Sequence, residues 1–257
     1  MTDYKTIETR ADAFNPGRNK FRVGEVLRHG FRVWTRNLMP FTVLSLVLHA
    51  PFIVWAALLV AWEADPVLWH RFESWCGLSL HLVNALLSAT VTYGVCMELE
   101  HRPASFARVI VNGLRRFLPA LAVAALAGFA MIAAGLLLVV PGLIVMCMLY
   151  VAVPAAVIER PGVIGALRRS RALTAGNRPR IFGLALLVFG FNVIVTLIGH
   201  GIAFGFADDG EPLMSVSDLV RSVVFGPLSA ALVATTYVLL RRQRDGVDTA
   251  ALSQIFE

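Results

Sequence analysis

Long apolar runs alternate along this chain with shorter polar segments. The apolar runs cover residues 38–62, 78–97, 118–158, 181–206 and 220–240. A helix that crosses a hydrocarbon core of about 30 Å needs about 20 residues. The run at 118–158 is long enough for two crossings, so the pattern predicts six transmembrane helices.

The run at 118–158 contains one strong turn signal, Pro141–Gly142. Proline removes a backbone donor and glycine tolerates unusual dihedral angles, so we predict the hairpin turn at these two residues. The fourth crossing would then cover only 143–158. A run this short predicts a tilted helix, a locally thinned bilayer, or a cytoplasmic end that is only partly immersed.

Three polar segments that precede crossings have the apolar spacing of amphipathic helices. Their apolar stripes are Val23, Val26, Leu27, Gly30, Phe31 and Trp34; Phe106, Val109, Ile110, Leu114 and Phe117; and Val163, Ala166, Leu167 and Ser170. A proline near the start of the following run comes after each segment: Pro40, Pro119 and Pro179. We therefore predict an all-α integral membrane protein in which six transmembrane helices and three cytoplasmic amphipathic interfacial helices form a pseudo-threefold repeat of helix–hairpin units.

The basic residues are distributed very unevenly around the predicted crossings. Of the 23 Lys and Arg residues, eight precede residue 38, four lie in 98–117, six lie in 159–180 and three follow residue 240. The opposite side would carry only Arg71 and Arg221. The positive-inside rule therefore predicts that both termini are cytoplasmic. Residues 1–22 would form a disordered cytoplasmic tail, and 23–257 a single six-span membrane domain.

Composition supports a membrane protein, because 57% of residues are hydrophobic and only 16% are charged. The net charge of +6 is explained by the segments between crossings, so we predict no nucleic-acid partner. Cys76, Cys96 and Cys147 form no ligand pattern with each other or with histidine, so we predict no metal site and no cofactor. No hydrolase or phosphate-binding motif is present, and we predict that the protein is not an enzyme.

Several polar residues lie within the predicted crossings. They are His49, Asn84, Asn192, Thr196 and His200, and the last three share one helix face at spacing i, i+4, i+8. Such residues either hydrogen-bond neighbouring helices or belong to a functional site. No Asp, Glu, Lys or Arg lies in the middle of a predicted crossing, which disfavours ion-coupled transport.

Three blocks of the sequence resemble a bacterial family of six-span membrane proteins. These blocks are 136–144 (LLLVVPGLI), 154–177 (PAAVIE, then GVIGALRRS and LTAGN) and 237–248 (with LR and DGVD). The family includes the membrane domain found ahead of some glycerophosphoryl diester phosphodiesterases and the YciC-like inner-membrane proteins. The resemblance implies a six-helix domain of the bacterial cytoplasmic (inner) membrane. It does not imply phosphodiesterase activity, which belongs to a separate soluble domain.

The central block places Glu159 shortly before Arg168, Arg169 and Arg171. One interpretation is an orienting charge pattern with a Glu–Arg contact. The other is a site for an anionic lipid headgroup, because the planar guanidinium matches phosphate. We expect a structural or accessory protein that contacts anionic phospholipid or a membrane-protein partner through these basic helices. A transporter or flippase of a lipid or small amphiphile is the alternative.

Overall fold

The structure is a computed structural model of the chain, and it describes residues 21–62, 65–99, 106–206 and 211–245. Most of the predicted tail at 1–22 lies outside these residues. The described part is built from helices: α2 (Val23–Arg36), α3 (Leu38–Ala61), α4 (Pro66–Leu99), α5 (Phe106–Arg115), α6 (Phe117–Leu137), α7 (Val139–Leu149), α8 (Ala152–Glu159), α9 (Val163–Thr174), α10 (Arg178–Phe206) and α11 (Glu211–Asp245).

Six segments are long and apolar enough to cross a membrane, which confirms the predicted all-α, six-span fold. They are Leu38–Leu59, Leu82–Leu99, Phe117–Leu137, Val139–Glu159, Arg178–Ile202 and Val216–Asp245. The prolines at 40, 119 and 179 all lie in the first turn of a span helix, where a missing N–H leaves no intrahelical bond unmade.

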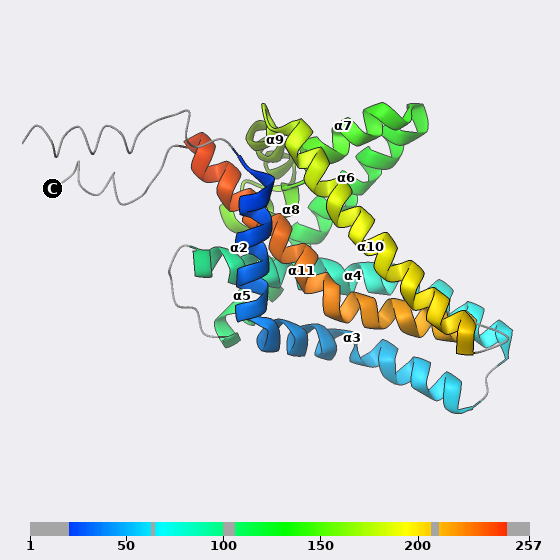
Figure 1. Cartoon of the computed structure of the whole chain (residues 1–257). Helices are drawn as coiled ribbons and strands as arrows, with labels where there is room; N and C mark the ends of the chain where they lie inside the picture. The colour runs from blue at the N-terminus through cyan, green and yellow to red at the C-terminus, as the bar shows by residue number, and fades with distance from the viewer. Residues whose placement is uncertain (1–20, 63–64, 100–105, 207–210, 246–257) are drawn as a thin grey trace, which may run out of the picture.

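The element order repeats three times as a surface helix followed by a helical hairpin. The surface helices are α2, α5 and α9, as the sequence predicts. In Figure 1, the far end of α3, the α6–α7 connection and the far end of α10 lie toward the right, whereas α2, α5 and α9 lie toward the left. The basic helices therefore gather at one end of the bundle.

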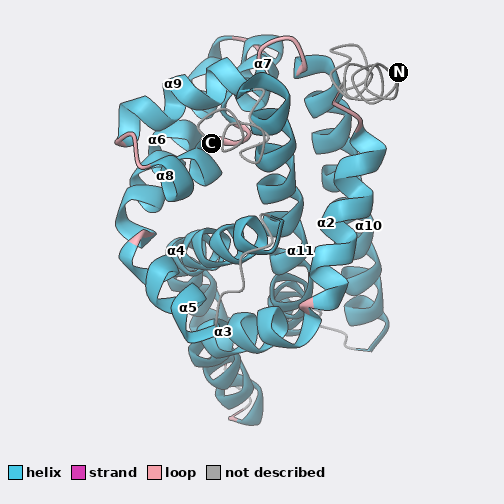
Figure 2. Ribbon diagram, turned by 90° about the vertical axis from the view of Figure 1, so that its left-hand side faces the viewer, coloured by secondary structure: helices cyan, strands magenta, loops and turns pink. Residues whose placement is uncertain are grey.

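The three hairpins do not pack equivalently, because α11 forms the centre of the bundle. It packs against α2, α3, α4, α8, α9 and α10, and its span is 61% buried, against 11% for the span of α10. Figure 2 shows α2, α10 and α11 side by side. One core cluster surrounds α11 with α8 and α9, and a second lies between α11, α3 and α4.

The predicted hairpin turn at Pro141–Gly142 is wrong, since the chain turns at Leu138. Leu138 has extended φ and ψ angles of −166° and 148°, and α7 begins at the next residue. Pro141 is the third residue of α7, where a missing N–H is tolerated. Gly142 instead allows close packing, because a Cβ there would lie 3.0 Å from the Cα of Gly135 on α6.

The fourth span is also longer than the sequence suggests, and it is broken. It runs over Val139–Glu159, 21 residues, so it needs no thinned bilayer. The break falls at Tyr150–Val151, between α7 and α8. Pro154 explains the break, because a proline ring clashes with the carbonyl four residues earlier, here that of Tyr150.

Helix α2 forms where the sequence predicts it, but it buries only part of the predicted stripe. Val26, Gly30 and Val33 are its buried residues, whereas Phe31 is 54% exposed. The cause is Gly30, where a Cβ would lie 2.7 Å from Cδ2 of Leu232 on α11. The two helices pack closely at this glycine, and Val26 and Val33, in line with it, are buried.

Candidate functional site

The exposed arginines of α2, α5 and α9 make one end of the bundle strongly cationic. Six of them project from the surfaces of these helices: Arg28, Arg32, Arg36, Arg108, Arg168 and Arg171. The opposite faces of the same helices are buried, at residues such as Val26, Val109 and Ala166. Each helix is thus held by its apolar side and presents guanidinium groups outward.

A tight connection between α8 and α9 brings Glu159 back toward Arg169. Glu159 is the last residue of α8, and α9 begins at Val163. Gly162 has a φ of 78°, a region that favours glycine because it has no Cβ. This turn sets the two helices side by side, with the carboxylate of Glu159 under the guanidinium of Arg169.

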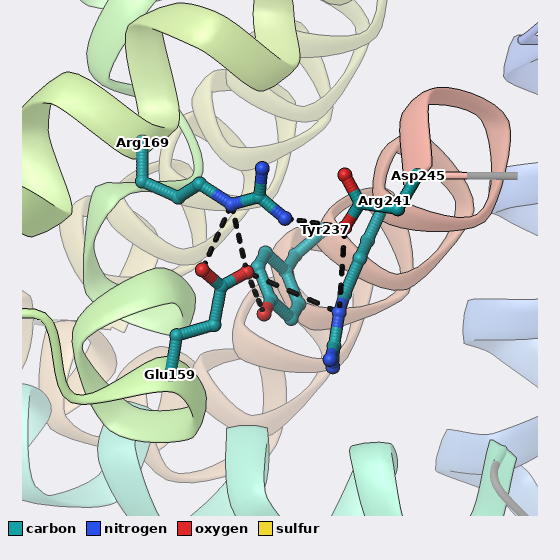
Figure 3. A network of polar contacts seen from close by, with 5 residues as sticks. All are labelled: Glu159, Arg169, Tyr237, Arg241 and Asp245. Carbon is teal, nitrogen blue, oxygen red and sulfur yellow. Dashed lines mark hydrogen bonds and ion pairs between the residues drawn. The ribbon is translucent and has the colours of Figure 1, made fainter. Parts of the chain in front are cut away.

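Glu159 is the centre of a polar network that joins α8, α9 and α11 (Figure 3). Nε of Arg169 donates to both carboxylate oxygens of Glu159, at 3.0 and 2.8 Å. The hydroxyl of Tyr237 donates to Oε1 of Glu159 at 2.8 Å, and Nη2 of Arg169 donates to Asp245. Nε of Arg241 lies 3.9 Å from Glu159 and 3.8 Å from Asp245.

Within this network, the guanidinium of Arg169 is hydrogen-bonded to two carboxylates of the protein itself. Burial lowers the pKa of Arg169, but hydrogen bonds to Asp245 and Glu159 outweigh burial and raise the pKa above its ordinary value. The Glu–Arg contact considered from the sequence is therefore present. Of the three arginines in the sequence block, Arg168 and Arg171 remain exposed, whereas Arg169 is only partly exposed.

Ser170 and Thr174, from the same sequence block as these arginines, also stabilise the break in the fourth span. The Met148 carbonyl lies in the last turn of α7, where carbonyls lack intrahelical partners. The hydroxyl of Ser170 donates to it at 2.8 Å, and the hydroxyl of Thr174 at 3.3 Å. The Ser and Thr of the sequence block thus satisfy a backbone group that the break leaves open.

Four of the five polar residues predicted within the spans, all but Thr196, contact one turn of α11. The hydroxyl of Ser222 lies 3.2 Å from Nε2 of His49 and 3.3 Å from Oδ1 of Asn84. On the neighbouring side of α11, Nη1 of Arg221 donates to Oδ1 of Asn192 at 3.4 Å.

An ion pair completes this turn of α11. Nε of Arg221 lies 3.2 Å from Asp218, and Nε2 of His200 lies 3.6 Å from the same carboxylate. Thr196 is half-buried on α10 between Asn192 and His200. The polar groups thus tie α3, α4 and α10 to α11, as expected of interhelical hydrogen bonding.

Within the part of the chain that the structure describes, no group of three or more His, Cys, Asp or Glu side chains could hold a metal ion. The side chains of Cys96 and Cys147 are buried.

Residues 78–240 match the family described as a domain of unknown function, DUF7847. The chain belongs to this family. No curated protein and no solved structure is similar enough to the chain to match it. The family match includes Glu159, Arg169 and Tyr237, while Asp245 and α2 lie outside the matched range.

Sequence reasoning missed the partners that α11 contributes to both polar clusters. Tyr237, Arg241 and Asp245 are spaced i, i+4, i+8, so their helical periodicity places them on one face. The same periodicity places Asp218 and Ser222, at spacing i, i+4, on one face of the helix. No sequence signal indicates that these faces meet Glu159 and His49, because the contacts span 78 and 173 positions of the chain.

Proposed function

We propose that this protein is an accessory protein of the bacterial cytoplasmic membrane that binds anionic phospholipid through its basic surface helices. In this proposal both termini are cytoplasmic, and α2, α5 and α9 lie at the inner headgroup layer. The resemblance to the membrane domain of the phosphodiesterases and to YciC-like proteins supports this location. In this proposal the protein has no catalytic activity of its own, and it acts by binding anionic phospholipid or a membrane-protein partner.

One observation carries the proposal: exposed arginines project from three separate helices at the same end of the bundle. Each basic residue near an anionic membrane surface contributes about 1 kcal/mol of attraction. Because α2, α5 and α9 are anchored by their apolar faces, their arginines are held at a fixed position relative to the transmembrane helices. This arrangement favours a lasting lipid contact over transient electrostatic steering.

The test is native mass spectrometry of the full chain in nanodiscs that contain both zwitterionic and anionic phospholipid. We expect anionic lipid to be enriched on the wild-type protein. Arg168→Gln/Arg171→Gln should lower that enrichment. Arg169 is left unchanged, because its loss would also open the Glu159 network.

The matched control is Arg71→Gln, which removes an exposed arginine of α4 at the opposite end of the bundle. If the basic surface helices bind the lipid, this variant should leave lipid enrichment as in the wild type, whereas reduced enrichment would favour the second candidate function described below. Equal enrichment of every lipid class on all three proteins would contradict the proposal.

A second candidate function is a transporter or flippase for a lipid or small amphiphile. It is favoured by an apolar pocket of about 470 Å³ between α3 and α4, lined by Trp55, Phe72 and Trp75, with Arg71 among its lining residues. A cation beside aromatic walls suits an amphiphile with an anionic head. Reconstituted vesicles with a fluorescent lipid in one leaflet test this function, since a transporter moves the label across and a purely structural protein does not.

A further inference from the structure

A second group of arginines lines a pocket that lies next to the Glu159 network but shares none of its side chains. The pocket lies where the α5–α6 junction meets the α8–α9 turn and has a volume of about 320 Å³. We call it the Arg116 pocket. Its lining includes Asn112, Arg115, Arg116, Pro119, Arg160 and Gly162.

Arg116 is fixed in place and forms one wall of the pocket. Its Nη1 donates to the carbonyl of Val157 at 2.8 Å, and its guanidinium lies 4.4 Å from the centre of the Tyr93 ring. Its Nε is buried and has no hydrogen-bond partner among the described residues. A buried donor without a partner is costly, so the hydrogen-bonding capacity of this guanidinium is not used up within the described protein.

The positive charges of the Arg116 pocket are not balanced by its own lining. Arg115 and Arg160 are exposed side chains, and no Asp or Glu is among the described residues that line the pocket. Burial lowers the pKa of Arg116, and the nearby charge of Arg160 lowers it further. The adjacent Glu159 does not compensate, because its carboxylate is bound by Arg169 and Tyr237.

Two helices also begin at this pocket. Arg116 is the N-cap residue of α6 and Gly162 is the N-cap residue of α9, and neither supplies a side-chain hydrogen bond to its helix. The first N–H groups of a helix lack intrahelical partners and attract anions. The starts of α6 and α9 therefore add to the positive potential that the arginines create at this pocket.

We propose that the Arg116 pocket binds a phosphate group, held by Arg115, Arg116 and Arg160. Guanidinium groups match phosphate oxygens with paired hydrogen bonds, and three of them neutralise a monoester or diester. The pocket includes Pro119, in the first turn of the α6 span, so it lies at the end of a membrane-spanning segment, where a lipid headgroup is expected. This inference rests on the proposed function, and it specifies which arginines recognise the phosphate group of the lipid.

The experiment uses the full-length protein and a variant that changes only the exposed arginines, Arg115→Gln/Arg160→Gly. Arg160 has a φ of 54°, so glycine removes its charge without straining the backbone. The probes are phosphatidic acid titrated into phosphatidylcholine nanodiscs, measured by native mass spectrometry, and inorganic phosphate, measured by thermal shift. We expect the variant to bind phosphatidic acid about ten- to a hundredfold more weakly, since it loses charged hydrogen bonds.

The two sources of phosphate give different results in the wild type. If the natural ligand is a lipid headgroup, phosphatidic acid binds already at a low mole fraction in the nanodisc. Millimolar inorganic phosphate then does not displace it. If the ligand is soluble, inorganic phosphate raises the melting temperature and displaces the lipid. Whichever of these results the wild type gives, binding should be about ten- to a hundredfold weaker in Arg115→Gln/Arg160→Gly. Arg116→Lys keeps the charge but loses the planar guanidinium, so it should also weaken binding.

A comparison with Arg168→Gln/Arg171→Gln separates this inference from the proposed function. Weaker lipid binding in that variant, with unchanged binding in Arg115→Gln/Arg160→Gly, would overturn the pocket and leave the proposed function standing. Unchanged binding in both would overturn both. A normal melting temperature in the absence of phosphate confirms that each variant is folded.

Discussion

Glu159 receives more polar contacts than any of the residues drawn with it in Figure 3. Arg169 and Tyr237 donate to it, and Arg241 lies nearby, so one carboxylate links three helices. The side chains of Glu159 and Arg169 are 20% and 26% exposed. Partial burial strengthens the network relative to a surface ion pair, which contributes about 0–1 kcal/mol.

Glu159→Gln should destabilise the protein by about 1–3 kcal/mol. The substitution keeps the shape of the side chain but removes its charge, which leaves Arg169 and Tyr237 with a weaker acceptor. Thermal unfolding in detergent measures the effect, and Arg168→Gln serves as the control because Arg168 is exposed. An unchanged melting temperature for Glu159→Gln would show that the network does not stabilise the fold.

At the same scale, the sequence indicated which polar residues matter more reliably than what they contact. His49, Asn84, Asn192 and His200 were singled out because polar groups within apolar runs are rare. Their partners on α11 follow from the packing of distant helices, which periodicity does not encode. The basic block likewise offers a Glu–Arg contact as one of two interpretations, but it does not indicate which of its arginines makes that contact.

Close helix packing at the element scale depends on a few glycines. A Cβ on Gly113 of α5 would lie 2.2 Å from Oγ1 and 2.8 Å from Cα of Thr90 on α4. The second of these atoms is backbone, so a rotamer change of Thr90 does not relieve the overlap. α5 is therefore held against α4 by the absence of a side chain at this position.

Gly113→Ala should displace α5 from α4 and lower stability by about 1–3 kcal/mol, the usual range for overpacking. Trypsin should then cut faster after Arg108 or Arg115, both of which lie on α5. Gly183→Ala is the matched control, because nothing lies within 4 Å of a Cβ there and alanine favours the helix. Similar digestion rates for the two variants would show that the close approach is not needed.

Elements were predicted well where one physical requirement dominates. A span needs about 20 apolar residues, and α3 and α10 begin and end within a few residues of their apolar runs. The predicted position of the α6–α7 turn is wrong because proline and glycine occur in more than one setting. Either residue can end a helix, but proline also occurs in the first turn of a helix, and glycine also allows two helices to pack closely. Pro141 and Gly142 occur in these latter settings, and only the packing of Gly142 on Gly135 reveals it.

For the whole molecule, the distribution of charge between the two ends predicts orientation in the membrane. In a variant whose three cysteines are replaced by alanine, Leu138→Cys should react with a membrane-impermeant maleimide in cells with a permeabilised outer membrane. Arg168→Cys should react only after the inner membrane is opened. Mass spectrometry of the labelled protein reads out both, and the reverse pattern would place the basic helices outside.

The central position of α11 has a consequence for biogenesis. A membrane protein is inserted segment by segment as it is synthesised, and α11 follows every helix that it packs against. Until α11 arrives, His49, Asn84, Asn192 and His200 lack their partners on it. An incomplete chain in the bilayer therefore displays unmet polar groups, a signal by which membrane chaperones and proteases can tell unfinished molecules from finished ones.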